Sequence, residues 1–390
     1  MFYSNTIFGQ LLNFLPKYKF NSLVGQHKGD DWARKTTAWN QFVVMLHAQA
    51  TGKESLREIE TGFKMHKNSW HHLGVNTVAK SSISDANNRR SYKIFKDLFY
   101  VILGQCKDIT GTRKFDFENP LYSFDSSTIS LCLNMFDWAK YTKTKGAFKL
   151  HILLNNRTTI PELLNITEGN VADITAIKQM ILNIEKGSIL VFDRAYIDYE
   201  WWQELDKKEI TFVSRAKSNQ NIFVTGQHKK ELKKGVIADE IVIFGDYNTI
   251  VKEKYPKKLR RVKYYDEKTK KEYTYLTNNF TLTALQIANI YKDRWQIEIF
   301  FKWIKQNLRI KNFLGTSKNA VLTQVWIAMI YYLLLAYIKF QTKFEKSLLT
   351  LTRMIKETIM FRRNLIDMLS LDTKTIIKFK PEQNPQQSFW

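Results

Sequence analysis

The feature that most constrains this chain is a stretch between residues 284 and 308 that contains neither proline nor glycine. Its apolar residues recur three and four positions apart, which predicts one long helix with a stripe that faces a core. At about 100° per residue, four polar residues fall within an arc of roughly 60° beside that stripe: Tyr291, Arg294, Glu298 and Lys305. A carboxylate, two cations and a phenol would thus lie at the edge of a buried face. An amphipathic helix with ordinary ion pairs would explain the same pattern.

Upstream of this helix, the chain follows the order strand, strand, strand, helix, strand. The strands are predicted at residues 121–131, 148–154, 162–167 and 188–192, with the helix from residue 174 to about 184. This order is the ribonuclease-H-like arrangement, in which the first and fourth strands are neighbours. The sequence therefore predicts an α/β fold with a ribonuclease-H-like catalytic core.

Two aspartates stand at related points of this core. Asp125 interrupts the first strand, and Asp193 directly follows the fourth, where α/β sheets place their ligands. An aspartate inside an apolar strand is costly unless it is paired or binds a metal. Either residue alone could equally be a cap or a structural group. Because the two strands are expected to be neighbours, we expect Asp125 and Asp193 to lie together, with Glu298 supplied by the long helix.

Three converging carboxylates suit a particular chemistry. They can hold two Mg²⁺ ions about 3.5–4 Å apart, which is the arrangement that promotes in-line displacement at phosphorus. Oxygen ligands without clustered Cys or His favour Mg²⁺ or Mn²⁺ over Zn²⁺. Arg294 and Lys305 would balance the charge and hold a DNA phosphate, and Tyr291 could donate a hydrogen bond to it.

Between Asp193 and Glu298 the chain is too long for a simple connection. Strand patterns continue from about residue 209 to 280, and a basic run occupies residues 254–263. We interpret this segment as a β-rich insertion in the catalytic domain, with its basic loop towards DNA. A solvated hairpin is the alternative.

Residues 1–115 are predicted to be helical. A polar turn containing Gly74 precedes a predicted basic helix at 84–99, which carries Arg89, Arg90 and Lys93. Helix, turn and basic helix is how a helix-turn-helix DNA reader is built. A solvated basic face on a helical domain would look the same.

The composition favours a polyanionic partner. The 390-residue chain carries a formal net charge of +23, for which nucleic acid is the first candidate and an anionic membrane the second. Residues 320–340 are apolar enough to raise the membrane question, but we favour a buried core helix over a transmembrane one. Cys106 and Cys132 have no metal-ligand spacing and suggest a reducing compartment. We therefore expect a cytoplasmic, nucleoid-associated protein with no membrane partner.

At these residues the chain resembles the insertion-sequence-4 DDE transposases. Tyr291, Arg294, Glu298 and Lys305 are similar to that family's Y-x2-R-x3-E-x6-K signature. The segments at 124–127 and 192–196 resemble its first and second aspartate motifs. The resemblance covers roughly residues 120–340, and is loose in the N-terminal region.

The resemblance implies cut-and-paste transposition with Mg²⁺, which Mn²⁺ could replace. The steps would be 3′ nicking, hairpin formation, its resolution and strand transfer at terminal inverted repeats. By this carry-over Asp125, Asp193 and Glu298 would be the catalytic metal ligands. The partners would be double-stranded DNA at the element ends and at the target, with a homodimer in the DNA complex.

The same reasoning divides the chain into three domains. We expect a DNA-end-binding domain at 1–115, a catalytic domain at 116–345 and a helical C-terminal region with a polar tail at 346–390. Three alternatives stay open: an inactive or domesticated transposase that only binds DNA, a metal nuclease that cuts without joining, and a basic membrane-surface protein. Asp173, Asp198 and Glu200 are rival acids that match no motif.

Overall fold

The computed structural model describes residues 5–106, 113–139, 141–142, 145–180, 184–218, 220–228, 235–244, 254–308, 310 and 312–370. The chain divides into two compact units, one of residues 108–306 and the other of residues 1–107 with 307–390. The predicted polar tail lies outside the described residues.

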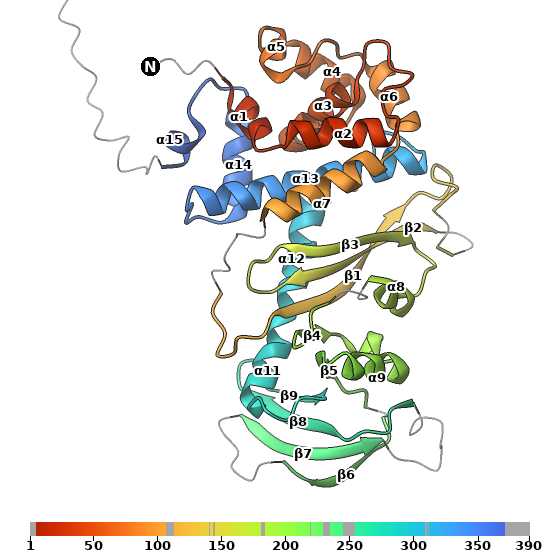
Figure 1. Cartoon of the computed structure of the whole chain (residues 1–390), viewed down its shortest axis with the longest axis vertical. Helices are drawn as coiled ribbons and strands as arrows, with labels where there is room; N and C mark the ends of the chain where they lie inside the picture. Colours follow the sequence, from red (N-terminus) through yellow and green to blue (C-terminus); the bar gives the residue numbers. More distant parts are fainter. Residues whose placement is uncertain are drawn as a thin grey trace, which may run out of the picture. The chain divides into compact units, whose positions relative to one another are not determined.

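The first unit is built on a nine-stranded sheet with the strand order β3-β2-β1-β4-β5-β9-β8-β7-β6 (Figure 1). Strand β4 pairs in parallel with β1 on one side and with β5 on the other, and β2 runs antiparallel to β1. The strands are β1 (Leu121–Leu131), β2 (Gly146–Asn155), β3 (Pro161–Glu168), β4 (Ile189–Phe192), β5 (Thr211–Arg215), β6 (Ile222–Gln227), β7 (Val236–Phe244), β8 (Leu259–Asp266) and β9 (Lys271–Thr277). The predicted proximity of the first and fourth strands is confirmed.

Strand β4 is buried on both faces because every residue in it is apolar. Leu190 and Phe192 pack in the same core as α8 (Asp173–Met180) and α9 (Tyr199–Lys207). Ile189 and Val191 pack in a second core with α11 (Ala284–Asp293). The sheet is thus covered by helices on both faces, as expected for a buried parallel strand.

The β-rich segment is part of the same sheet. The prediction placed the strand at 210–215 inside an insertion, but β5 runs parallel to β4 and belongs to the central core. Strands β6 to β9 extend the sheet beyond β5 through antiparallel pairs. The boundary between the core and the insertion depends on which strands pair, and sequence periodicity does not show strand pairing.

The helix predicted over 284–308 is interrupted at Arg294. Helix α11 ends at Asp293 and α12 (Trp295–Asn307) follows directly. Thr283 and Gln286 form a capping box at the start of α11. Arg294 keeps helical dihedral angles, but its N–H donates to the Tyr291 carbonyl, one residue nearer than in an α-helix. The prediction of a single helix was therefore wrong at one residue.

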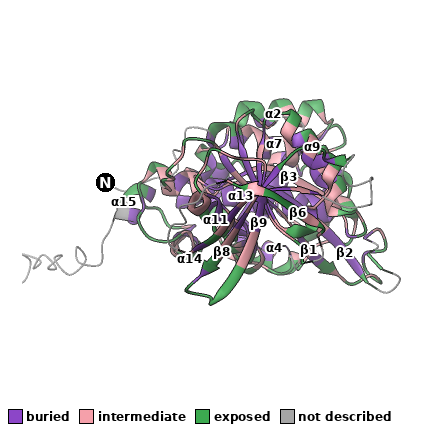
Figure 2. Ribbon diagram, turned by 90° about the horizontal axis from the view of Figure 1, so that it is seen from below, coloured by how far each residue is buried: buried purple, intermediate pink, exposed green. Residues whose placement is uncertain are grey.

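The second unit is helical. Its elements are α1 (Ile7–Asn13), α2 (Lys17–Gln26), α3 (Ala38–Thr51), α4 (Leu56–Lys64), η1 (Lys67–Ser69), α5 (Trp70–Leu73), α6 (Lys80–Arg89), α7 (Lys93–Gln105), α13 (Lys318–Gln341), α14 (Leu348–Thr358) and α15 (Leu365–Ser370). Outer helices such as α2 are exposed along most of their length (Figure 2).

Helix α13 is the core of this unit. It contacts α3, α6, α7 and α14, and it is buried along most of its length. Its length and hydropathy alone would let it cross a membrane, but 89% of its most apolar window is buried inside the protein. This burial supports the predicted core helix. We expected the catalytic domain to extend to residue 345, but α13 packs with the N-terminal helices. The functional division into three domains stays a prediction.

Candidate active site

Two of the predicted acids lie at the same level on neighbouring strands. Phe124 of β1 pairs with Phe192 of β4 in parallel register, so the next residues are Asp125 and Asp193. Strand β4 ends there, and Asp193 accepts a hydrogen bond of 2.7 Å from the backbone N–H of Arg194. The two carboxylates therefore meet at the carboxyl edge of the parallel strands, as the sequence predicted.

The helix pair α11–α12 brings the third acid to this edge. A guanidinium nitrogen of Arg294 lies 2.6 Å from Glu298 Oε1, and the other lies 3.6 Å from Asp125 Oδ2. The Tyr291 hydroxyl donates to Asp193 Oδ1 across 3.4 Å. Five of the six predicted catalytic-domain residues are thus linked by direct contacts.

Two side chains bind Asp293, the last residue of α11, and hold the junction with α12 at which Arg294 lies; we call this group the Asp293 clamp. The guanidinium of Arg113 donates to both carboxylate oxygens of Asp293, at 2.9 and 2.5 Å. Asn156 donates to the Asp293 carbonyl at 3.0 Å and to its carboxylate at 3.2 Å. Sequence reasoning missed this clamp, because its members are far apart in the chain and match no motif.

Burial and neighbouring negative charges both disfavour the ionised form of Asp125. Burial raises the pKa of Asp125 to about 6, and the charges of Asp193 and Glu298 push in the same direction. Arg294 and the Ser126 backbone N–H oppose that shift. A buried carboxylate beside two further acids favours a bound cation.

The side chain of Arg294 supplies part of that positive charge. Burial lowers its pKa, but Tyr291, Glu298 and Asp125 outweigh burial and raise the pKa above its ordinary value. Its Nε is buried and has no hydrogen-bond partner among the described residues. One donor therefore stays available for a further acceptor.

The donor chemistry fits a divalent ion, since all three acids offer hard oxygen ligands. In the part of the chain that the structure describes, no three His, Cys, Asp or Glu side chains are gathered closely enough to hold an ion. The guanidinium of Arg294 occupies the space between Asp125 and Glu298. Coordination by all three acids thus requires this guanidinium to move aside.

Lys305 and two of the rival acids, Asp198 and Glu200, make none of the contacts described above for the site. Lys305 is half-buried on α12, seven positions beyond Glu298. Asp198 caps α9 and lies 2.9 Å from Lys178 Nζ. Glu200 lies 3.1 Å from Lys254 Nζ on the surface.

Asp173 is the rival acid that lies beside the site. It accepts a hydrogen bond of 2.9 Å from the Ser126 hydroxyl and lies 3.1 Å from Lys149 Nζ. It therefore contacts the neighbour of Asp125 rather than Asp125 itself.

The predicted basic helix at 84–99 is two helices, α6 and α7, and its arginines differ in role. The Arg90 side chain is fully buried and donates to Gly29, Gln41, Asp30 and Thr36 at 2.8–3.0 Å. Buried in this way it cannot reach a DNA backbone, so the prediction for Arg90 was wrong.

Arg89 and Lys93 are exposed. Arg89 pairs with Asp85 one turn away, at 2.8 Å. A DNA contact by Arg89 and Lys93 stays a prediction.

The basic run at 254–263 is not a basic loop. Its second half forms β8, and four of its cations pair with acids: Lys254 with Glu200, Lys257 with Asp206, Arg260 with Asp239, and Arg261 with Glu240. The Arg260–Asp239 pair is buried and holds β8 to β7. Arg260 and Arg261 therefore join β8 to β7, whereas Lys254 and Lys257 pair with α9.

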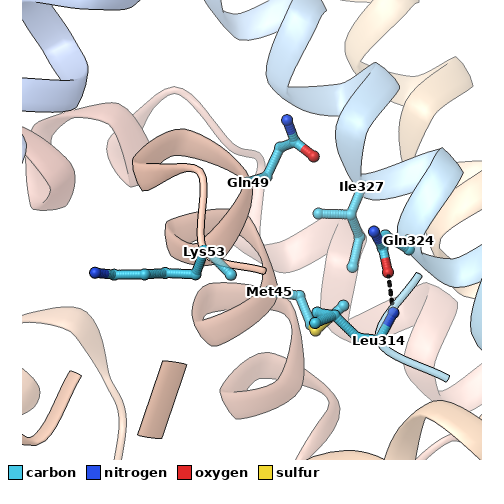
Figure 3. Close-up of a pocket in the computed structure, with 7 residues that line it drawn as sticks. Met45, Gln49, Lys53, Leu314, Gln324 and Ile327 are labelled. Atoms are coloured by element: carbon cyan, nitrogen blue, oxygen red, sulfur yellow. Dashed lines mark hydrogen bonds between the residues drawn. The ribbon is translucent and has the colours of Figure 1, made fainter. Parts of the chain in front are cut away.

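A cavity in the helical unit is too small for a substrate. It lies between α3 and α13, and Gln324 accepts a hydrogen bond from the Leu314 backbone N–H at its wall (Figure 3). The ammonium of Lys53 points away from the other labelled side chains. The cavity has a volume of about 10 Å³, which holds a single water at most.

Comparison with known proteins decides the family. A family model described as "Transposase DDE domain" matches residues 116–334, and a domain of unknown function, DUF4372, matches residues 3–76. A protein of Sinorhizobium fredii named as transposase y4zB is 34% identical over 289 residues, which cover 73% of this chain and 78% of that protein. The chain belongs to the DDE transposase family.

Two further comparisons accompany this result. A Geobacillus stearothermophilus protein named as the transposase of insertion sequence element IS5377 is 29% identical over 67% of this chain and 68% of its own length. A piggyBac transposase synaptic complex with hairpin DNA is similar over 98% of this chain and 84% of that chain, with 11% identity and a TM-score of 0.42. At that TM-score the likeness does not bear on the fold.

As a DDE transposase, the protein is a DNA transposase of the insertion-sequence kind with a ribonuclease-H-like core. Enzymes of this family cleave DNA and transfer strands with the help of divalent metal ions. This confirms the predicted enzyme class and the predicted DNA partner.

Proposed function

We propose that this DDE transposase is of the insertion-sequence-4 type and carries out cut-and-paste transposition at terminal inverted repeats. The steps are 3′ nicking, formation and resolution of a hairpin at the element end, and strand transfer into target DNA. The observation that carries the proposal is the level placement of Asp125 and Asp193 on paired strands, with Glu298 joined to Asp125 through Arg294.

In this proposal Asp125, Asp193 and Glu298 hold two Mg²⁺ ions, and Mn²⁺ can replace them. When bound, such ions activate the attacking oxygen and stabilise the leaving oxygen of a phosphoryl displacement. Arg294 is the resting counter-charge of the site. It turns from Glu298 to a DNA phosphate when DNA arrives, because a phosphate offers a bidentate guanidinium an equivalent acceptor.

The other residues of the signature position the reacting groups. The Tyr291 hydroxyl orients Asp193. Burial raises the pKa of Tyr291 to about 12, which keeps this hydroxyl a hydrogen-bond donor well into the alkaline range. Lys305, two turns beyond Glu298, contacts DNA near the cut. The exposed cations Arg89 and Lys93 contact the element end. The DNA complex contains two copies of the chain.

The test removes one carboxylate at a time. We expect Asp125→Asn, Asp193→Asn and Glu298→Gln each to abolish Mg²⁺-dependent cleavage of DNA that carries the inverted repeats flanking the gene. Binding of the same DNA should persist, because each change removes a ligand and leaves the fold in place.

The matched control is Asp198→Asn, a change of the same kind at an acid that only caps α9 and pairs with Lys178. It should cleave like the wild type. Normal cleavage by any one of the three site variants would remove that residue from the proposed site.

A further inference from the structure

A cation continues the row of catalytic acids on the next strand. In the parallel run β1, β4 and β5, Phe192 pairs with Phe124 on one side and with Ser214 on the other. The residue after Ser214 is Arg215, so Asp125, Asp193 and Arg215 follow one another across the carboxyl ends of three adjacent strands. The negative site therefore changes to positive within one strand spacing, about 4.8 Å.

Arg215 opens onto a groove in the same unit. The groove has a volume of about 300 Å³, and five of its lining side chains are cations: Arg194, Arg215, Lys217, Arg261 and Lys263. Arg194 directly follows Asp193, so the groove begins beside the acids. From there it extends over β5, β9 and β8.

Most of this positive charge is not balanced by the protein. Arg261 pairs with Glu240 at 2.6 Å, whereas Arg194, Lys217 and Lys263 have no carboxylate partner within 4.0 Å among the described residues. The Arg215 guanidinium lies over the ring of Tyr273, 5.1 Å from its centre, which orients the cation without neutralising it. Glu272 also lines the groove. A hollow in which cations outnumber acids in this way matches a chain of phosphates.

We propose that this groove binds the sugar-phosphate backbone of DNA that leaves the catalytic carboxylates across β5, β9 and β8. The proposal rests on the proposed function, since it takes Asp125 and Asp193 as the place where DNA is cut. In this proposal the strands β9 and β8, beyond β5, form part of the surface that binds DNA. The contact is to phosphates and therefore independent of base sequence.

The experiment compares two double variants of the full chain that remove equal charge. Lys217→Gln/Lys263→Gln removes two unpaired cations of the groove. Lys268→Gln/Lys270→Gln removes two exposed cations from the β8–β9 turn, which does not line the groove. The probe is a 30-base-pair duplex of arbitrary sequence, because phosphate contacts do not depend on sequence.

The quantity measured is the slope of log affinity against log salt concentration. Each lost phosphate contact should lower its magnitude by about 0.9, so the groove variant should lose about 1.8 and the turn variant almost nothing. Equal slopes for the two variants would overturn the proposal.

Cleavage and joining by the same variants identify which DNA occupies the groove. A groove variant that is deficient only on substrates with duplex beyond the cut assigns the groove to flanking DNA. A defect only in strand transfer assigns it to target DNA. Wild-type cleavage is measured separately, so an inactive wild type with the expected slopes would refute the proposed function and leave the groove standing.

Discussion

Replacing Arg90 with methionine should destabilise the helical unit by about 3 kcal/mol. The Arg90 side chain is fully buried and donates to the carbonyls of Gly29 and Thr36, to buried Gln41 and to Asp30. Removing one partner of a buried ion pair costs roughly 3–5 kcal/mol, because the remaining polar groups lose their partners. Asp30 is 36% exposed and can be rehydrated, so we take the lower end of that range.

Hydrogen exchange of the backbone amides in α3 and α7 measures this loss directly. Gln41 of α3 accepts a hydrogen bond from Arg90, and α7 begins three residues after Arg90. A change of about 3 kcal/mol should speed exchange of the slowest amides in these helices about a hundredfold. The matched control is Arg89→Met. Its exposed ion pair with Asp85 is worth roughly 0.3–0.5 kcal/mol, so exchange should change about twofold at most.

The two variants also separate structure from DNA contact. Arg90→Met should lower DNA binding only under conditions in which the helical unit opens, whereas Arg89→Met should weaken binding with at most a twofold change in exchange. Wild-type exchange in the Arg90 variant together with weakened DNA binding would refute our interpretation of Arg90 as a structural residue.

Two further predictions concern a buried histidine and the organising helix. Burial lowers the pKa of His47 to about 3, so between pH 6.5 and 3 the unfolded chain binds a proton that the folded chain does not. Stability should therefore fall as the pH is lowered through that range, and His47→Gln should flatten this part of the curve in urea unfolding; an identical pH dependence would contradict the assignment. Arg294→Ala should impair hairpin formation and strand transfer more than first nicking, because the acids themselves remain. A stepwise cleavage assay across a Mn²⁺ titration checks this, and failure at the first nick that high Mn²⁺ rescues would show that Arg294 supports the metal ligands instead.

Element type could be predicted from local sequence pattern, and the placement of Asp125 beside Asp193 could be predicted from the order of the elements. Strand β1 spans the predicted residues 121–131, and β4 ends at Phe192 as expected. Once the order of strands and helix is known, the handedness of the connections leaves few topologies. The proximity of Asp125 and Asp193 follows from that order.

The break between α6 and α7 could not be predicted, because a distant residue supports it. Between α6 and α7, Asn319 of α13 donates to the carbonyls of Asn87 and Arg90 and accepts from the Tyr92 N–H. These bonds satisfy backbone groups that a continuous helix would have paired internally. The local sequence of residues 84–99 therefore predicts one helix, but the contact with Asn319 supports a break between two helices.

The sequence by itself determined the fold class of the catalytic core and the polyanionic partner, and it proposed the three acids, since periodicity, residue type and net charge carry that information. Only the tertiary structure decided which cations are available to DNA. Arg90 and Arg260 read as surface cations, yet their side chains are fully buried on acids of neighbouring elements. Arg215 and Lys263 carry no motif, yet strand pairing places Arg215 next to Asp193, and both cations line one groove. A fully buried cation that is paired with an acid is closed to DNA, and long-range packing decides which cations are buried in this way.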